Sequence, residues 1–93
     1  MTIGICTIEL VIPHARSLKE KRKVLRGLLD RLRNRHNVSV AEVAHQGLWQ
    51  RAGIAIAAVG SSQKPIDAMF EGILREIDTQ LPGQVIRHEV EFV

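Results

Sequence analysis

The chain has 93 residues, of which 45% are hydrophobic and 25% charged, and its formal net charge is +3. This length leaves room for one domain over residues 1–93. Cys6 is the only cysteine, which excludes an intramolecular disulfide framework and a multi-cysteine zinc site. No run approaches the roughly 20 apolar residues of a transmembrane helix, so we expect a cytoplasmic protein with no membrane contact.

Two elements are expected in the first third of the chain. Residues 3–12 alternate as a strand with one fully apolar side, and Pro13 ends it because proline cannot donate to a ladder. Ser17 and Glu20 have the spacing of a capping box, which predicts a helix from there to about residue 36. Its apolar stripe is expected to consist of Leu18, Val24, Leu25, Leu28, Leu29 and Leu32.

Four further elements are expected after this helix. Residues 38–43 and 48–59 are typical of strands, joined by a turn at 45–47. A second helix is expected over 63–80, ended by Pro82 and Gly83, and a last strand over 84–93 with Ile86, Val90 and Phe92 on its core side. The order β-α-β-β-α-β predicts an α+β, ferredoxin-like fold: a four-stranded antiparallel sheet with both helices on one face and the other face open.

Charge is concentrated in the first helix. Residues 16–35 contain nine basic and two acidic residues, a net charge of +7, whereas the remainder has four basic and eight acidic residues. Evenly spaced cations can follow a phosphate backbone and release its counterions, so this helix predicts contact with RNA or a ribosomal subunit. The expected contacts are Arg16, Lys19, Arg22, Lys23, Arg26 and Arg33.

A solvated basic face without a partner is the main alternative, since acidic residues of the second helix could neutralise some of these cations in surface pairs. Another anion is a further alternative. RNA binding by the open sheet face is disfavoured because the chain has no tyrosine and two phenylalanines that fit helix and core positions. Trp49, with Arg51 beside it, is the exception: it fits either a base-stacking residue or an interface residue.

A second functional hypothesis concerns the open side of the sheet. Gly53, Ala55, Ala57 and Val59 give the strand over 48–59 a second apolar side, which would be exposed in a monomer. Formation of a homodimer would cover it, and the protein would then be an interaction module.

An enzyme is not expected. Cys6 lies within a strand on the expected core side, where a thiol is inert. The four histidines show no metal-ligand spacing, so neither a metal nor a cofactor is expected. The weakest alternative is a phosphate-handling enzyme of the acylphosphatase type, in which Arg16 and the N-terminal amides of the first helix would hold the anion.

Three blocks of the sequence resemble the YlxP-like family of small bacterial proteins, a family of unknown function. The blocks are Ser-Leu-Lys-Glu-Lys-Arg at 17–22, Leu-Arg-Asn-Arg-His-Asn-Val-Ser-Val-Ala-Glu-Val at 32–43 and Leu-Trp-Gln-Arg-Ala at 48–52. The resemblance implies a ferredoxin-like fold and a gene that often neighbours translation-initiation and ribosome-assembly factors. It supplies no catalytic residues. Family members often carry acids in the turn before the third block, where this chain has Ala44, His45, Gln46 and Gly47.

Overall fold

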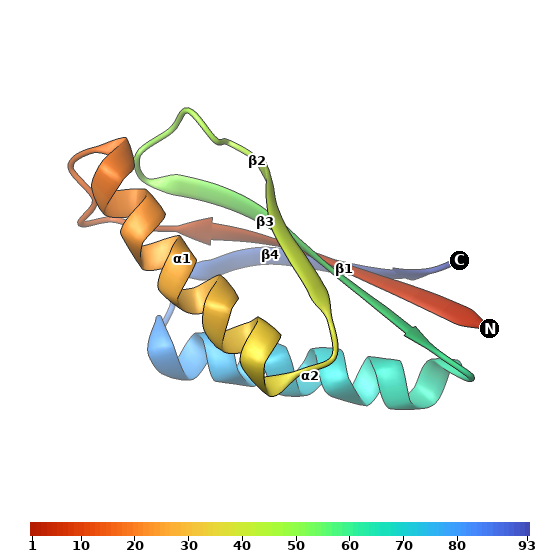
Figure 1. Cartoon of the computed structure of the whole chain (residues 1–93). Coiled ribbons are helices and arrows are strands. Elements are labelled where there is room, and N and C mark those ends of the chain that lie inside the picture. Colours follow the sequence, from red (N-terminus) through yellow and green to blue (C-terminus); the bar gives the residue numbers. More distant parts are fainter.

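The computed structural model describes residues 1–93 and contains four strands and two helices in the expected order. They are β1 (Thr2–Val11), α1 (Leu18–Arg35), β2 (Ser39–Ala44), β3 (Arg51–Gly60), α2 (Gln63–Gln80) and β4 (Val85–Phe92) (Figure 1). The largest departure from expectation is the start of β3. It begins at Arg51 instead of residue 48, because Leu48, Trp49 and Gln50 belong to the β2–β3 loop.

All strand pairs are antiparallel, and the sheet order is β2-β3-β1-β4. Both helices lie against the same face of this sheet (Figure 1). The long central strands β1 and β3 pair along their full lengths, from Thr2 opposite Gly60 to Val11 opposite Arg51. The ferredoxin-like α+β architecture is therefore confirmed, with β2 and β4 as edge strands.

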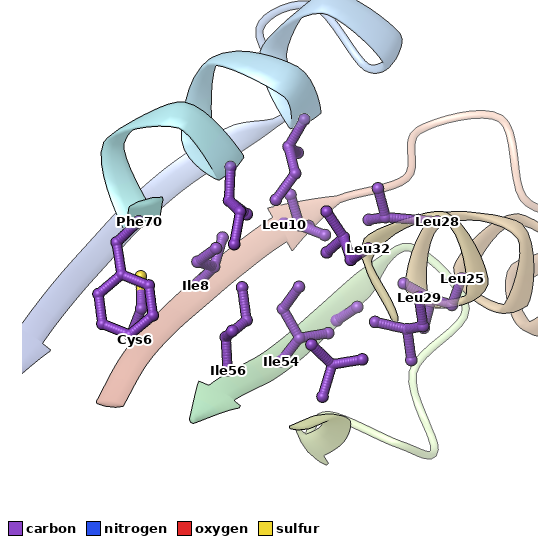
Figure 2. Packing of buried hydrophobic residues seen from close by; sticks show 14 of the residues in the cluster. Cys6, Ile8, Leu10, Leu25, Leu28, Leu29, Leu32, Ile54, Ile56 and Phe70 are labelled. Carbon is purple, nitrogen blue, oxygen red and sulfur yellow. The ribbon is translucent and has the colours of Figure 1, made fainter. Parts of the chain in front are cut away.

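One apolar layer between the sheet and the helices forms the core. Side chains from α1, α2, β1 and β3 converge there, among them Leu28, Leu32, Phe70, Ile8 and Ile56 (Figure 2). Burying each side chain of this size contributes about 1.5–3 kcal/mol relative to leaving it exposed. Two expected core positions on α1 are wrong. Val24 is exposed because it lies on the flank of α1, and Leu18 is only half-buried at the start of the helix.

A register shift in the β1–β4 pairing decides which residues of β4 face the core. The shift lies between Glu9 and Leu10, and it places Val85 opposite Leu10. Val85 consequently packs against the core, whereas Ile86 is 46% exposed. The expectation that Ile86 shares the core side with Phe92 is wrong, because an irregularity of one residue reverses the alternation.

The capping box at the start of α1 is present in a shifted form. The hydroxyl of Ser17 accepts from the backbone N–H of Glu20 at 3.1 Å. The carboxylate of Glu20 in turn accepts from the backbone N–H of Arg16 at 2.7 Å, one residue before the cap. Two N–H groups near the start of the helix are thereby satisfied. Neither helix of the structure is both long and apolar enough to cross a membrane.

Candidate nucleic-acid interface

The basic residues of α1 point in three directions around the helix. Successive residues are rotated by about 100°, and the buried leucines fix the side that faces the sheet. Arg22, Arg26 and Arg33 then lie on the flank beside β2, and Lys19 and Lys23 lie on the outer side. Arg31 and Arg35 lie on the flank beside α2, where they contact Gln80 and Glu76, respectively.

A groove follows the flank of α1 along the edge strand β2. Its volume is about 220 Å³, and its lining consists of Arg22, Leu25, Arg26, Leu29, Arg33 and Glu42. Leu25 and Leu29 are buried core residues, so they form an apolar floor between the charged side chains. The three arginines thus border one concave surface, an arrangement that the linear sequence does not show.

Arg33 is already engaged within the chain. Its guanidinium donates to the carbonyl oxygen of Val40 in β2 at 3.0 Å and to the carboxylate of Asp30 at 3.1 Å. The first contact satisfies a carbonyl on the free edge of the sheet. Arg33 therefore holds α1 against β2, and it has fewer donors left for an external anion than the other candidates have.

The remaining five candidates have no partner in the chain. The side chains of Arg16, Lys19, Arg22, Lys23 and Arg26 are exposed, and none takes part in an ion pair or a side-chain hydrogen bond. Of the acids on α2, Glu76 pairs with Arg35 and His36. The acids of α2 therefore neutralise Arg35, as the alternative drawn from the sequence expects for some cations, but they leave the five candidates unpaired.

Lys21 is a basic residue of α1 whose role was not predicted from the sequence. It is fully buried, and its ammonium group lies 2.9 Å from a carboxylate oxygen of Glu42 and donates to the carbonyl of His45 at 2.6 Å. A helical wheel offered a signal, since Lys21 lies four residues before Leu25 and seven before Leu28 on the buried side. The lysine thus joins α1 to β2 and to the first residue of the loop that follows it.

His45 completes this attachment of the β2–β3 loop. Its φ of 59° lies in the left-handed region, which costs a non-glycine residue about 1 kcal/mol or more. Its ring Nε2 lies 2.9 Å from the Glu9 carboxylate, and the same oxygen accepts from Arg51 at 2.7 Å. These contacts, with the one from Lys21, offset the backbone strain.

The contacts with Arg51 and His45 lower the pKa of Glu9. The hydrogen bond from Arg51 is the largest influence and holds the pKa of Glu9 below its ordinary value of 4.5, with the charge of Arg51 and the contact with His45 acting in the same direction. Partial removal from water opposes the shift without reversing it. Glu9 is therefore ionised at neutral pH, and Arg51 is held by it on the open sheet face.

Trp49 and Leu48 are exposed at the tip of the same loop, at 54% and 50% of their surfaces. They line a shallow hollow of about 420 Å³ together with Gln50 and Arg51. Gln50 anchors this tip: its side-chain amide donates to the carbonyls of Pro13 and Ala15, at 3.1 Å each. The loop is therefore attached to the segment that leads into α1.

The open sheet face holds the four small residues considered as a dimer interface. Gly53 is buried beneath Ala44: a Cβ at this position would lie 2.7 Å from the Cβ of Ala44. Ala55 and Ala57 are half-buried, and Val59 is 64% exposed. Only the last three can therefore offer surface to a partner. A hollow of about 230 Å³ lies over Gly53.

Three observations bear on the catalytic alternatives. Burial raises the pKa of the Cys6 thiol to about 11, so the thiol stays protonated at neutral pH and supplies no thiolate nucleophile. No cluster of three or more histidine, cysteine, aspartate or glutamate side chains could hold a metal ion. At the start of α1, the N–H groups of Arg16 and Glu20 are occupied by the capping box.

Comparison with known proteins places this fold and these residues in a family. Residues 3–90 match the family described as "Protein of unknown function (DUF503)". The chain belongs to this family. It is 43% identical over 77 residues to the "Uncharacterized protein YlxP" of Bacillus subtilis (strain 168), covering 83% of this chain and 84% of that protein. The resemblance drawn from the three sequence blocks is confirmed.

A solved structure supports the architecture alone. The "De novo designed protein Foldit4" superposes with a TM-score of 0.53 at 17% identity, over 99% of this chain and 94% of that chain. A designed chain with the same fold illustrates that the architecture by itself implies no activity. The function of this DUF503 member therefore depends on the residues at its surface.

Proposed function

We propose that the protein is a non-catalytic, cytoplasmic RNA-binding protein that contacts RNA, in the setting of a ribosomal subunit, through the basic surface of α1. One observation carries the proposal: five exposed cations on or next to one helix have no partner within the chain. They are Arg16, Lys19, Arg22, Lys23 and Arg26.

The spacing of these residues suits a phosphate backbone. Arg22 and Arg26 are one helical turn apart on the groove side, and Lys19 and Lys23 are one turn apart on the outer side, so each pair spans about 6 Å along the axis. Neighbouring phosphates of an RNA strand lie at comparable separations. Binding through unpaired cations also costs less free energy, because no ion pair within the chain has to break.

A matched pair of charge reversals tests the proposal. The variant Lys23→Glu/Arg26→Glu removes two expected phosphate contacts. The control Lys64→Glu/Arg75→Glu changes the net charge equally on α2, where both residues are exposed and unpaired. Affinity for a ribosomal RNA fragment is measured by filter binding or anisotropy over a range of salt concentrations.

The α1 variant should weaken binding and reduce the slope of log affinity against log salt by about 1.4–1.8, which is the release of counterions from two phosphates. The α2 control should change the affinity and the slope far less. Equal losses in the two variants would mean that only net charge matters, and absence of binding by the parent chain at low salt would eliminate the proposal.

A homodimer is the second candidate, and the pairing of β1 with β3 favours it. Val59 lies opposite Ile3, and Ala57 lies opposite Ile5, so the apolar residues form a continuous strip on the open face. We propose that two copies pack these faces together, which would remove the strip from water. Val59→Lys should then give a monomer in light scattering, while Val24→Lys on α1 should leave the mass unchanged. A monomeric parent chain at micromolar concentration would refute it.

The phosphate-handling alternative has less support. The amides that would hold a phosphate at the start of α1 are partly taken up by Ser17 and Glu20. A turnover assay with an acyl phosphate decides it: we expect no turnover by the parent chain, and turnover that Arg16→Ala abolishes would establish it.

A further inference from the structure

The exposed tryptophan lies at the end of the basic surface of α1, on a loop that several contacts hold in place. Gln50 follows Trp49 directly, and it donates to the carbonyls of Pro13 and Ala15, on the segment that continues into Arg16. Its own carbonyl accepts from the backbone N–H of Ile12 at 3.0 Å. In Figure 1 the β2–β3 loop accordingly runs beside the start of α1.

The other side of the loop is attached to α1 itself. The buried ammonium group of Lys21 donates to the carbonyl of His45, and the backbone N–H of Leu48 closes a turn onto the same carbonyl at 3.0 Å. A short loop attached at 45, 48 and 50 has little freedom at Trp49. An indole that is already held in place loses little conformational entropy when a ligand covers it.

Trp49 does not belong to the hydrophobic core, nor is it one of the partly buried residues packed against it. More than half of its surface is free, and the hollow of about 420 Å³ extends along the loop beside it. Exposing so much of a large aromatic side chain forgoes stabilisation by burial, and in nucleic-acid-binding proteins such a ring serves as a stacking platform. Arg16 and Lys19, at the end of α1 nearest to the loop, are without partners in the chain.

We infer that Trp49 stacks on an unpaired base, and that the RNA bound by this protein is therefore single-stranded where it meets the β2–β3 loop. This inference rests on the proposed RNA binding and adds to it the class of RNA. Arg16 and Lys19 hold phosphates on either side of the stacked base. Arg22 and Arg26 contact the phosphates of the following nucleotides along the groove. A base within a duplex has both its faces covered by neighbours, so it cannot stack on the indole.

The sole tryptophan makes this proposal directly measurable, because the chain has one Trp and no Tyr. Intrinsic fluorescence is followed during titration with oligoadenylate, and separately with the same strand annealed to oligouridylate. The single strand should quench the indole emission and the duplex should not. Trp49→Ala should lose about 5- to 150-fold in affinity for the single strand, the range expected for one base stacked on an aromatic ring.

Two further variants separate stacking from general apolar contact. Trp49→Phe keeps an aromatic face and should retain most of the affinity. Leu48→Ala removes a side chain of similar exposure that has no π-face, and it should change the affinity less than twofold. Equal losses in Leu48→Ala and Trp49→Ala would overturn the proposal. Because both side chains are exposed, neither change should alter the melting temperature greatly.

The outcomes also distinguish this inference from the proposed function. Binding of both RNA forms without quenching, unaffected by Trp49→Ala but weakened by Lys23→Glu/Arg26→Glu, would refute stacking and keep RNA binding by α1. Failure of the parent chain to bind either form at low salt would refute both.

Discussion

Replacing the buried lysine by an uncharged residue of similar size should destabilise the protein strongly. Lys21→Met keeps most of the volume and removes the ammonium group that contacts Glu42 at 2.9 Å and the carbonyl of His45 at 2.6 Å. No water can replace the lost charge at this fully buried position. The variant therefore leaves a carboxylate and a carbonyl without their partner.

The size of the effect follows from these two contacts. A hydrogen bond from a charged donor contributes about 1.5–3 kcal/mol, and a fully buried charge stripped of its partner costs about 3–5 kcal/mol. The side chain of Glu42 keeps 20% of its surface exposed, but the oxygen that faces Lys21 is buried, so water relieves only part of the second cost. We expect a loss of about 2–4 kcal/mol, which lowers the melting temperature of a domain of this size by about 10–25 °C.

Urea and thermal denaturation followed by circular dichroism measure this loss. The double variant Lys21→Met/Glu42→Met no longer contains the unpaired carboxylate, so it should be at least about 1 kcal/mol more stable than Lys21→Met alone. A single variant within about 0.5 kcal/mol of the parent chain, or a double variant no more stable than the single one, would refute the reasoning.

Three further predictions concern the sheet. Because the pKa of Glu9 is lowered in the folded state, its ion pair adds stability at pH values above 4.5, and this stability is lost as the pH falls through the folded pKa. The difference in stability between the parent chain and Glu9→Gln, measured by urea titration at several pH values, should therefore shrink in acid. A constant difference would contradict the role of Arg51. Gly53→Ala should lower the free energy of unfolding by about 1–3 kcal/mol in the same assay, because the new Cβ meets that of Ala44. Adding Ala44→Gly to this variant should recover part of the loss. Full stability of Gly53→Ala alone would show that the strands can separate freely there. The Cys6 thiol should react with a disulfide reagent only after unfolding, since it is buried with a pKa of about 11, and rapid reaction in the native state would disprove this.

The element order was predictable because each element carries a complete local signal. The capping box at Ser17 and the apolar periodicity of both helices require no knowledge of the rest of the chain. The start of β3 was not predictable in the same way. Trp49 has high strand propensity, but the side chain of Gln50 binds the carbonyls of Pro13 and Ala15, contacts that lie 35 residues or more away in the sequence.

The candidate site was predictable in its composition and not in its geometry. The charge of residues 16–35 is visible in the sequence, yet the division of its cations depends on where β2 and α2 lie. Lys21 is internal because Glu42 approaches it from β2, and Arg35 is neutralised because Glu76 approaches it from α2. The helical periodicity places Lys21 on the buried side of α1, but it does not show which residues of β2 or α2 lie opposite the cations.

The contacts of some of these cations within the chain limit how many phosphates the basic segment can contact. Lys21, Arg31, Arg33 and Arg35 are engaged within the chain, which leaves five of the nine cations in this segment available. For single-stranded RNA, five contacts correspond to a slope of log affinity against log salt of about −3.5 at most. A steeper measured slope would require either that Arg31 and Arg35 release their partners on α2 or that two copies bind together. Measuring the slope for Arg35→Gln decides between these possibilities, because only the first predicts that it becomes shallower.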